Sequence, residues 1–282
     1  MLKKVLTIAF VVLVASNINA QRWNDWDWDD DSWYDYSTPF IEFNAGLSEI
    51  KHDAFINKFS DVGLGELKLG FSSRDSFYKG VVFEMEDKYF FVSNLSTELH
   101  VDEPEAVSLD SKLWRFGFGK RSGYGYDFSG FGIFPYTTSG YSLSKLQMSE
   151  YPFVPLEDIK VLDRFNEAIR FGSTVEGGLQ LSIVNTISFD IGYEASTIFP
   201  RYLIWKHLGS AIIEEAGLSF LDHFIDEVVD ASPAVGPIIN FLLKNGYRYA
   251  AYSLKKGDMN WPFPTEEPLT YETVKVGITF TF

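Results

Sequence analysis

The chain has 282 residues, of which 46% are hydrophobic, 17% aromatic and 22% charged, and it contains no cysteine. This composition excludes a disordered or collagen-like chain, and the lack of cysteine excludes a disulfide framework, a thiolate metal site and a cysteine nucleophile. The formal charge of −15 disfavours binding to nucleic acid and to anionic lipid headgroups. A high aromatic content with a mean hydropathy of only −0.05 favours half-apolar strands over membrane helices.

Residues 1–20 have the pattern of a secretory signal peptide. Lys3 and Lys4 form a basic start, residues 5–15 are apolar, and Ala20 closes a small-residue cleavage site. The apolar stretch is too short for a membrane-spanning helix, which needs about 20 apolar residues. We therefore expect these residues to be removed and the remainder of the chain to be exported.

The last twelve residues alternate in polarity. Apolar side chains at every second position are separated by polar or small ones, and the apolar positions are Val274, Val276, Ile278, Phe280 and Phe282. Because successive side chains of a strand point to opposite faces, this pattern predicts a strand that is apolar on one face only.

This strand resembles the C-terminal signal by which the insertion machinery recognises bacterial outer-membrane β-barrel proteins. The positions that match the signal are Lys275, Gly277, Phe280 and Phe282. The resemblance implies an all-β fold, a transmembrane antiparallel β-barrel of the small eight-stranded type. It also implies an outer-membrane location, with the membrane lipid and the insertion machinery as partners.

Seven upstream segments show the same alternation and bring the expected strand count to eight. These segments are 41–47, 66–72, 81–86, 114–119, 130–133, 175–183 and 187–194. An aromatic run at 89–91 interrupts the pattern, so a turn at 87–88 and a further strand at 247–254 would give ten strands instead. Short connections (74–79, 123–126, 185–186) alternate with long ones (51–63, 99–111, 138–170, 200–269), as periplasmic turns and external loops do in outer-membrane barrels.

The polar face of these strands is expected to line the barrel interior. The charged residues on that face are Glu42, Glu66, Lys68, Glu84, Arg115, Glu176, Asp190, Glu194 and Lys275. Such a mixed lining is typical of a structural ion-pair network, and a continuous channel would be narrow. The same face carries glycines at 46, 70, 117, 119, 130, 132, 178, 192 and 277, which predict either strong strand coiling or unfilled space that a loop could enter.

Within the barrel domain (37–282), a helical insertion is predicted at about 205–245. Apolar residues recur at three- and four-residue spacing over 205–230, Ser232-Pro233 is a start signal for a second helix, and Asn245-Gly246 is a stop signal. The first helix is acidic, which suits an anionic lipid surface poorly. The insertion could cap the barrel rim, plug the interior or bind a partner.

Residues 21–36 form an acidic, tryptophan-rich tail that we expect in the periplasm. The tail interleaves six aspartates with Trp23, Trp26, Trp28 and Trp33. Its Asp-x-Asp-x-Asp run is similar to the start of a calcium loop, but Asp30 and Tyr36 stand where that loop needs Gly and Glu. A flexible solvated tail is one interpretation, and a partner-binding peptide is the other, because indole rings are frequent anchors at interfaces.

The residues offer little support for catalysis. The four histidines are His52, His100, His207 and His223, and no His-Ser pair or Gly-x-Ser-x-Gly motif accompanies them. We expect no catalytic, metal or cofactor site, and a structural or interaction role as a subunit of a larger outer-membrane assembly with a protein partner there or in the periplasm. The alternatives are a narrow small-solute pore or transporter, and a lipid-modifying outer-membrane enzyme.

Overall fold

The structure is a computed structural model that describes residues 38–52, 59–78, 80–99, 109–128, 131–148, 156–184 and 186–282. The chain divides into two units, Met1–Asp35 and Tyr36–Phe282, and the description below concerns the second. The expected signal peptide (1–20) and tryptophan-rich tail (21–36) lie outside the described residues, as does His100.

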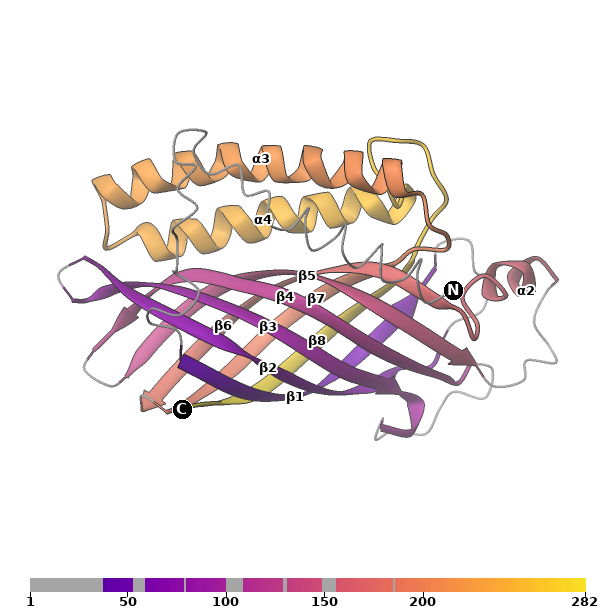
Figure 1. Ribbon diagram of the computed structural model, residues 1–282, viewed down its shortest axis with the longest axis horizontal. Helices are drawn as coiled ribbons and strands as arrows, with labels where there is room; N and C mark the ends of the chain where they lie inside the picture. The colour runs from indigo at the N-terminus through magenta and orange to yellow at the C-terminus, as the bar shows by residue number, and fades with distance from the viewer. Residues whose placement is uncertain are drawn as a thin grey trace, which may run out of the picture. The chain divides into compact units, whose positions relative to one another are not determined.

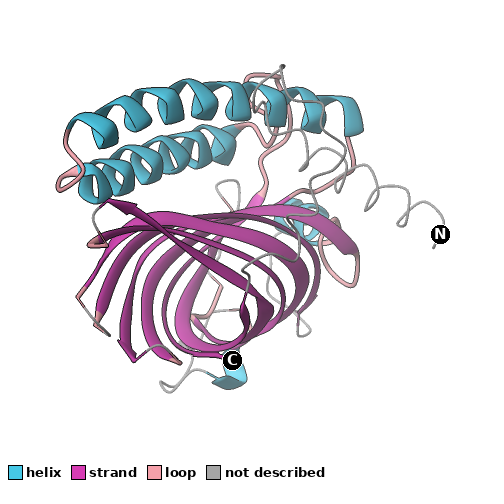
Figure 2. Ribbon diagram, turned by 60° about the vertical axis from the view of Figure 1, so that its left-hand side comes forward, coloured by secondary structure: helices cyan, strands magenta, loops and turns pink. Residues whose placement is uncertain are grey.

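Eight antiparallel strands form a closed barrel in chain order (Figures 1 and 2). The strands are β1 (Thr38–Lys51), β2 (Val62–Tyr78), β3 (Val82–Ser96), β4 (Ser111–Asp127), β5 (Gly132–Met148), β6 (Ile169–Val184), β7 (Ile187–Ile198) and β8 (Leu269–Thr281). β8 pairs with β1 over twelve positions, from Phe40–Thr281 to Lys51–Thr270. Closure leaves no strand edge unpaired, and the prediction of an eight-stranded antiparallel barrel is confirmed.

The ten-strand alternative is wrong. Asp87 and Lys88 lie in the middle of β3, which continues without a turn to Ser96, and residues 247–254 belong to a helix. The aromatic run keeps the strand alternation, because Tyr89 and Phe91 point inward while Phe90 points outward and is 61% exposed. Apolar rings therefore occupy both faces of β3, which hides the period-two signal in the sequence.

β5 is longer than expected and extends to Met148, so the connection to β6 covers only 149–168. The connections at 79–81, 128–131 and 185–186 lie at the end of the barrel where β1 starts and β8 stops, called here the short-turn end. The long connections leave the strands at the opposite end, called here the long-connection end, and their described parts include a short 3-10 helix (Thr97–Leu99) and α2 (Leu156–Leu162).

The connection between β7 and β8 folds into two antiparallel helices, α3 (Ile204–Ala231) and α4 (Gly236–Gly257). This helical hairpin lies along the outer wall of the barrel, neither on the rim nor in the interior, so the cap and plug expectations are wrong (Figures 1 and 2). α4 also continues through the predicted stop at Asn245-Gly246, where the Asn245 side chain donates a hydrogen bond to the Phe241 carbonyl one turn earlier. None of the described helices is both long and apolar enough to cross a membrane.

Candidate functional site

The barrel interior is filled by charged side chains in its middle section. Ten of them, six acidic and four basic, are at most 6% exposed. They are Glu42, Glu66, Lys68, Asp87, Arg115, Arg121, Glu176, Asp190, Glu194 and Lys275. All of them stand on inward-facing positions of the strands, so the alternation of each strand is what brings them together.

Arg115 of β4 reaches across the interior. Its Nη1 lies 2.5 Å from Glu194 Oε1, and its Nη2 lies 3.3 Å from Glu66 Oε2. Its Nε donates to Ser93 Oγ at 2.7 Å, and a further hydrogen bond goes to the Tyr271 hydroxyl. A planar guanidinium with several donors suits this position, because it can hold carboxylates on β2 and β7 at the same time.

Two lysines complete the centre of this interior network. Lys275 Nζ of β8 lies 2.7 Å from Glu194, 2.8 Å from Glu176 and 3.1 Å from Glu66. Lys68 Nζ of β2 lies 2.8 Å from Glu42 and stands 4.8 Å from the centre of the Tyr89 ring. Each buried cation therefore has at least one carboxylate within 3 Å, which offsets part of the cost of removing it from water.

Arg121 holds the part of the network nearer the short-turn end. Its Nη2 donates to both carboxylate oxygens of Glu42, at 2.9 and 2.7 Å. Its Nη1 lies 3.2 Å from Asp87 and 3.5 Å from Asp190. The guanidinium also stacks over the Tyr136 ring at 4.5 Å, so one side chain connects β1, β3, β5 and β7.

Buried apolar clusters lie on both sides of the charged network. Towards the short-turn end, Met85, Phe134 and Tyr136 form a buried cluster, and Arg74 stacks over the Phe134 ring at 4.3 Å. At the long-connection end a larger buried cluster fills the barrel. It includes Leu64, Leu95, Leu113 and Ile198 from the strands, and Phe59, Leu109, Leu162 and Phe165 from the connections.

The inward glycines make room for large neighbouring side chains. A Cβ added to Gly178 would stand 2.4 Å from the ring and hydroxyl of Tyr136, and one added to Gly119 would stand 2.7 Å from the Tyr89 ring. The space that these glycines leave is therefore occupied by tyrosine rings on adjacent strands. No unfilled space for a loop exists at these two positions, and strong strand coiling stays a prediction.

Eight of the nine predicted interior charges lie in the network, and Glu84 does not. Glu84 is exposed on the outer wall, because in β3 the buried neighbours Met85 and Asp87 take the inward positions. The inward placement of Glu84 followed from the rule that apolar residues such as Met85 point outward, which fails in β3. Asp87 and Arg121 are interior charges outside the predicted set, although Arg121 follows Arg115 by an even number of residues and is paired with Asp87 across the sheet.

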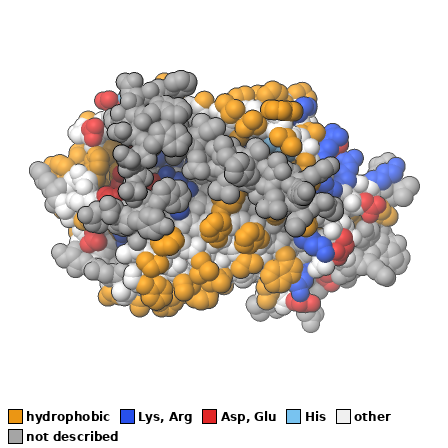
Figure 3. Space-filling model, in the orientation of Figure 1, with side chains coloured by type: hydrophobic (Ala, Val, Ile, Leu, Met, Phe, Trp, Pro, Cys, Tyr) orange, Lys and Arg blue, Asp and Glu red, His pale blue; other side chains and the backbone are white. Residues whose placement is uncertain are grey.

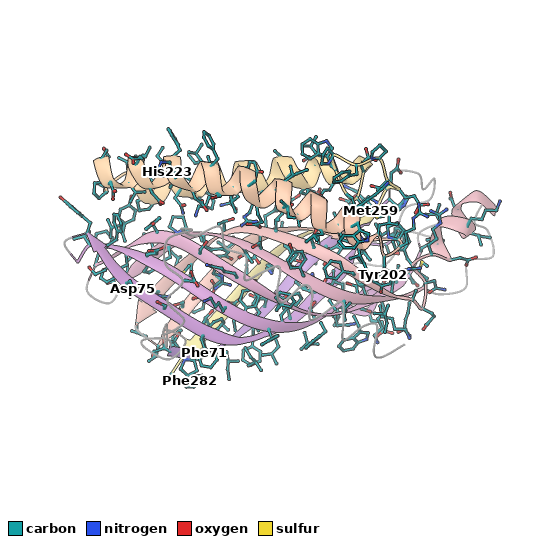
Figure 4. The ribbon with its side chains drawn as sticks, turned by 45° about the horizontal axis from the view of Figure 1, so that its top comes forward. Phe71, Asp75, Tyr202, His223, Met259 and Phe282 are labelled. Atoms are coloured by element: carbon teal, nitrogen blue, oxygen red, sulfur yellow. The ribbon has the colours of Figure 1, made fainter. Side chains whose placement is uncertain are left out.

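The four residues of the expected insertion signal take different places. Lys275 belongs to the interior network, and the backbone of Gly277 lies against the Asn44 side chain. Phe280 shares the outer face of β8 with Val274 and Val276, and Phe282 is 71% exposed on the side of the barrel away from the hairpin (Figure 4). Whether they act as an insertion signal stays a prediction. The partner-binding candidates Trp23, Trp26, Trp28 and Trp33 lie outside the described residues.

The outer wall of the barrel has two kinds of surface. Away from the hairpin it carries exposed large apolar side chains, among them Phe43, Phe71, Phe90, Phe116 and Val276. Figure 3 shows hydrophobic side chains on the wall and also on the helices above it. An apolar exterior around a charged interior is the arrangement of a transmembrane barrel and the reverse of a soluble one.

Beneath the hairpin a strip of outward side chains on β5, β6 and β7 is small or polar, beside larger ones such as Tyr141. Thr137, Ala195 and Thr197 point outward, yet each is only 2% exposed. Gly177 lets α4 approach closely, because a Cβ there would stand 2.6 Å from Asn245 Oδ1. Small residues allow a helix backbone to come near its support, as they do between helices packed within membranes.

The hairpin is attached to the barrel wall along the length of the barrel, through β4, β5 and β8. At the short-turn end, the Tyr126 hydroxyl donates to the Ala234 carbonyl between the helices at 2.6 Å. In the middle, Asn245 Nδ2 donates to the Tyr136 carbonyl at 3.2 Å. Towards the long-connection end, Lys256 Nζ lies 2.6 Å from Glu272 Oε1 of β8.

The histidines do not form a catalytic arrangement in the described part of the chain. The His52 ring stands edge-on to Phe165 at 6.0 Å, the His207 ring is stacked on Phe199 at 4.5 Å, and His223 is exposed on α3 (Figure 4). The residues that the structure describes contain no group of three His, Cys, Asp or Glu side chains that could hold a metal ion.

Comparison with known proteins finds similar solved structures but no family. No protein-family model and no curated protein matches the chain. The structure of Neisserial surface protein A (NspA) is 10% identical with a TM-score of 0.43, covering 86% of this chain and 97% of that one. The structure of Ail, the attachment invasion locus protein of Yersinia pestis, is 11% identical with a TM-score of 0.35, covering 88% and 100%. A second Ail structure, in complex with the heparin analogue sucrose octasulfate, is 9% identical with the same TM-score and coverage.

Proposed function

We propose that this chain is an integral outer-membrane protein with a sealed barrel that serves a structural or interaction role. The membrane assignment rests on the exposed apolar wall around a charged interior, because a closed sheet with this polarity satisfies its backbone hydrogen bonds within hydrocarbon. The alternation of short and long connections supports an orientation with the short-turn end in the periplasm.

From the burial of its interior charges we infer that the barrel is sealed. Side chains that line an open aqueous pore would be in contact with water, whereas the ten charges of the interior network are at most 6% exposed. The buried apolar clusters towards the two ends of the barrel further oppose the passage of water and ions. The proposal therefore ranks a structural role above the alternative of a narrow pore or transporter.

Conductance in planar bilayers tests the sealed barrel. The purified protein, folded by the criterion of heat-modifiable migration on a gel, should give no stable conductance, while a water-filled porin in the same bilayers serves as the positive control. Steady ion-selective openings that change with Glu176→Ala would refute the sealed barrel, because Glu176 lies in the centre of the network.

The interaction role is supported by what the chain carries besides a minimal barrel. The wall-bound hairpin and the tryptophan-rich tail at residues 21–36 are both additions to the eight strands. Affinity purification from native membranes in mild detergent should recover a second outer-membrane or periplasmic protein in a fixed ratio. Recovery of this chain alone from intact native membranes would contradict membership of a larger assembly.

We further propose that the chain has no catalytic activity. A lipid hydrolysis assay with the purified protein tests this proposal.

A further inference from the structure

Acidic side chains of α3 form ion pairs with lysines of α4 between the two helices of the hairpin. Glu214 of α3 forms an ion pair with Lys255 of α4, and both side chains are only 14% exposed. Asp222 of α3 lies 2.9 Å from Lys244 of α4. The acidic helix thus finds its opposite charges on the neighbouring helix.

The outer face of the hairpin is, in contrast, rich in large apolar side chains. On α3 the exposed ones include Trp205, Ile212, Phe220 and Phe224, with Trp205 and Phe220 at least 80% exposed. On α4 they include Ile238, Leu242, Tyr249 and Leu254. Large apolar side chains are also exposed on the bare barrel wall, and exposing so many of them to water would be costly because nothing described covers them.

The length of this apolar face matches a bilayer. Trp205 to Phe224 covers twenty residues, which corresponds to roughly 29 Å of α-helix at 1.5 Å per residue, close to the hydrocarbon thickness of about 30 Å. The exposed acids Asp226, Glu227 and Asp230 begin directly after Phe224, at the tip of the hairpin. Trp205 stands at the other end, where tryptophan is favoured at a membrane–water interface.

The apolar face of the hairpin is also continuous with the apolar wall of the barrel. The Tyr249 ring of α4 packs against the Tyr193 ring on the outer face of β7, with the two ring centres 6.3 Å apart. Tyr193 is paired with Val274 of β8, and the outward Ile191 of β7 is paired with Val276 of β8. Val274, Val276 and Ile191 are each more than 50% exposed on the bare wall.

From these observations we infer that the outer face of the α3–α4 hairpin contacts the acyl chains of the membrane, so that the hairpin lies in the hydrocarbon layer as a lateral extension of the barrel. The inference rests on the proposed function, since it requires the barrel itself to be in the membrane. It also accounts for the small and polar strip on β5–β7, which the hairpin shields from lipid. Neither helix would be a membrane span by itself. The polar side chains of the hairpin are paired between the helices or bonded to the barrel wall, as in Glu214–Lys255 and Asn245–Tyr136.

Spin labels on single cysteines test this inference, and the cysteine-free chain makes each label unique. Phe220→Cys on α3 and Leu242→Cys on α4 report on the hairpin. Phe116→Cys on the bare wall is the lipid control, and Asp75→Cys at the short-turn end is the water control (Figure 4). Each labelled variant is reconstituted in phosphatidylethanolamine–phosphatidylglycerol vesicles, and its folding is checked by heat-modifiable migration on a gel.

Collision of each label with oxygen and with a water-soluble nickel complex is then measured by power saturation. The labels at positions 220 and 242 should lose collisions with nickel and gain collisions with oxygen relative to position 75, to the same degree as the label at position 116. High nickel accessibility at 220 and 242 with a protected position 116 would overturn the inference and leave the membrane barrel intact. Protection from both reagents at 220 and 242 would overturn it in favour of a protein contact. Nickel access at position 116 would refute the proposed function itself.

Discussion

Replacing Arg115 by methionine tests whether paired charges hold the barrel interior together. Methionine retains an unbranched side chain but removes the charge and the donors that contact Glu66, Glu194, Ser93 and the Tyr271 hydroxyl. After the change, Lys275 is the cation nearest to Glu194, at 2.7 Å, and it also lies 3.1 Å from Glu66. Lys275 is then the only cation close to Glu194 among the described residues, while Glu66 also keeps Lys68 at 3.7 Å.

The expected loss of stability follows from this imbalance. Removing one partner of a buried ion pair costs about 3–5 kcal/mol, because it leaves an uncompensated charge away from water. Since Lys275 still contacts both carboxylates, we expect Arg115→Met to lie at the lower end, about 3 kcal/mol. Equilibrium unfolding in urea of the vesicle-inserted protein, followed by tryptophan fluorescence and by heat-modifiable migration, measures the change.

Two further variants make the Arg115 result interpretable. Arg164→Met removes an ion pair with Glu266 in which the Arg164 side chain is 48% exposed, and it should cost at most about 1 kcal/mol. Adding Glu194→Gln to Arg115→Met should restore part of the loss, because it removes one of the carboxylates left without its arginine. If Arg115→Met costs no more than the Arg164 control, or if the double variant is less stable than the single one, the interior network does not stabilise the barrel as argued.

Three other properties can be checked by simpler changes. Gly178→Ala should destabilise the barrel by about 1–3 kcal/mol through its clash with Tyr136, as measured by the same unfolding assay. Gly65→Ala is the control and should be neutral, because a Cβ there meets no atom within 4 Å. Equal effects of the two substitutions would contradict the close packing at Gly178. Deleting Phe282 should lower the amount of heat-modifiable folded protein in cells, and unchanged assembly would count against an insertion signal. Removing residues 21–36 should leave the barrel folded but lose a co-purifying partner, and full retention of the partner would argue that the tail does not bind it.

The alternation of polar and apolar residues predicts the barrel from sequence because it is a local property of each strand. Lys275 and Glu176 are far apart in the chain, yet counting every second residue within each strand places both on the inward face, and they are 2.8 Å apart in the structure. The same counting fails for Glu84. There the rule that apolar residues face lipid conflicts with an interior that contains Met85, Phe91 and Tyr89 as well as charges.

The outward positions beneath the hairpin could not be recognised from the sequence either. Thr137 on β5 and Thr197 on β7 are buried outward positions, so their polarity does not produce the apolar alternation of a lipid-facing strand. The helical periodicity of the insertion does predict two helices, but periodicity states only that a helix has two faces. It does not state which partner each face meets.

The sequence by itself determined the antiparallel barrel class, most of the inward charges and the presence of two helices, because each depends on the spacing of neighbouring residues, while the choice between eight and ten strands needed the assembled sheet. Tertiary structure alone decided which charges pair and where the hairpin lies. Closure of the barrel brings β1 beside β8, so that Thr279 donates to Glu42 at 3.2 Å across 237 residues of chain. The hairpin lies on the wall because a strip of small side chains, contributed by three strands, matches α4 only once those strands are assembled.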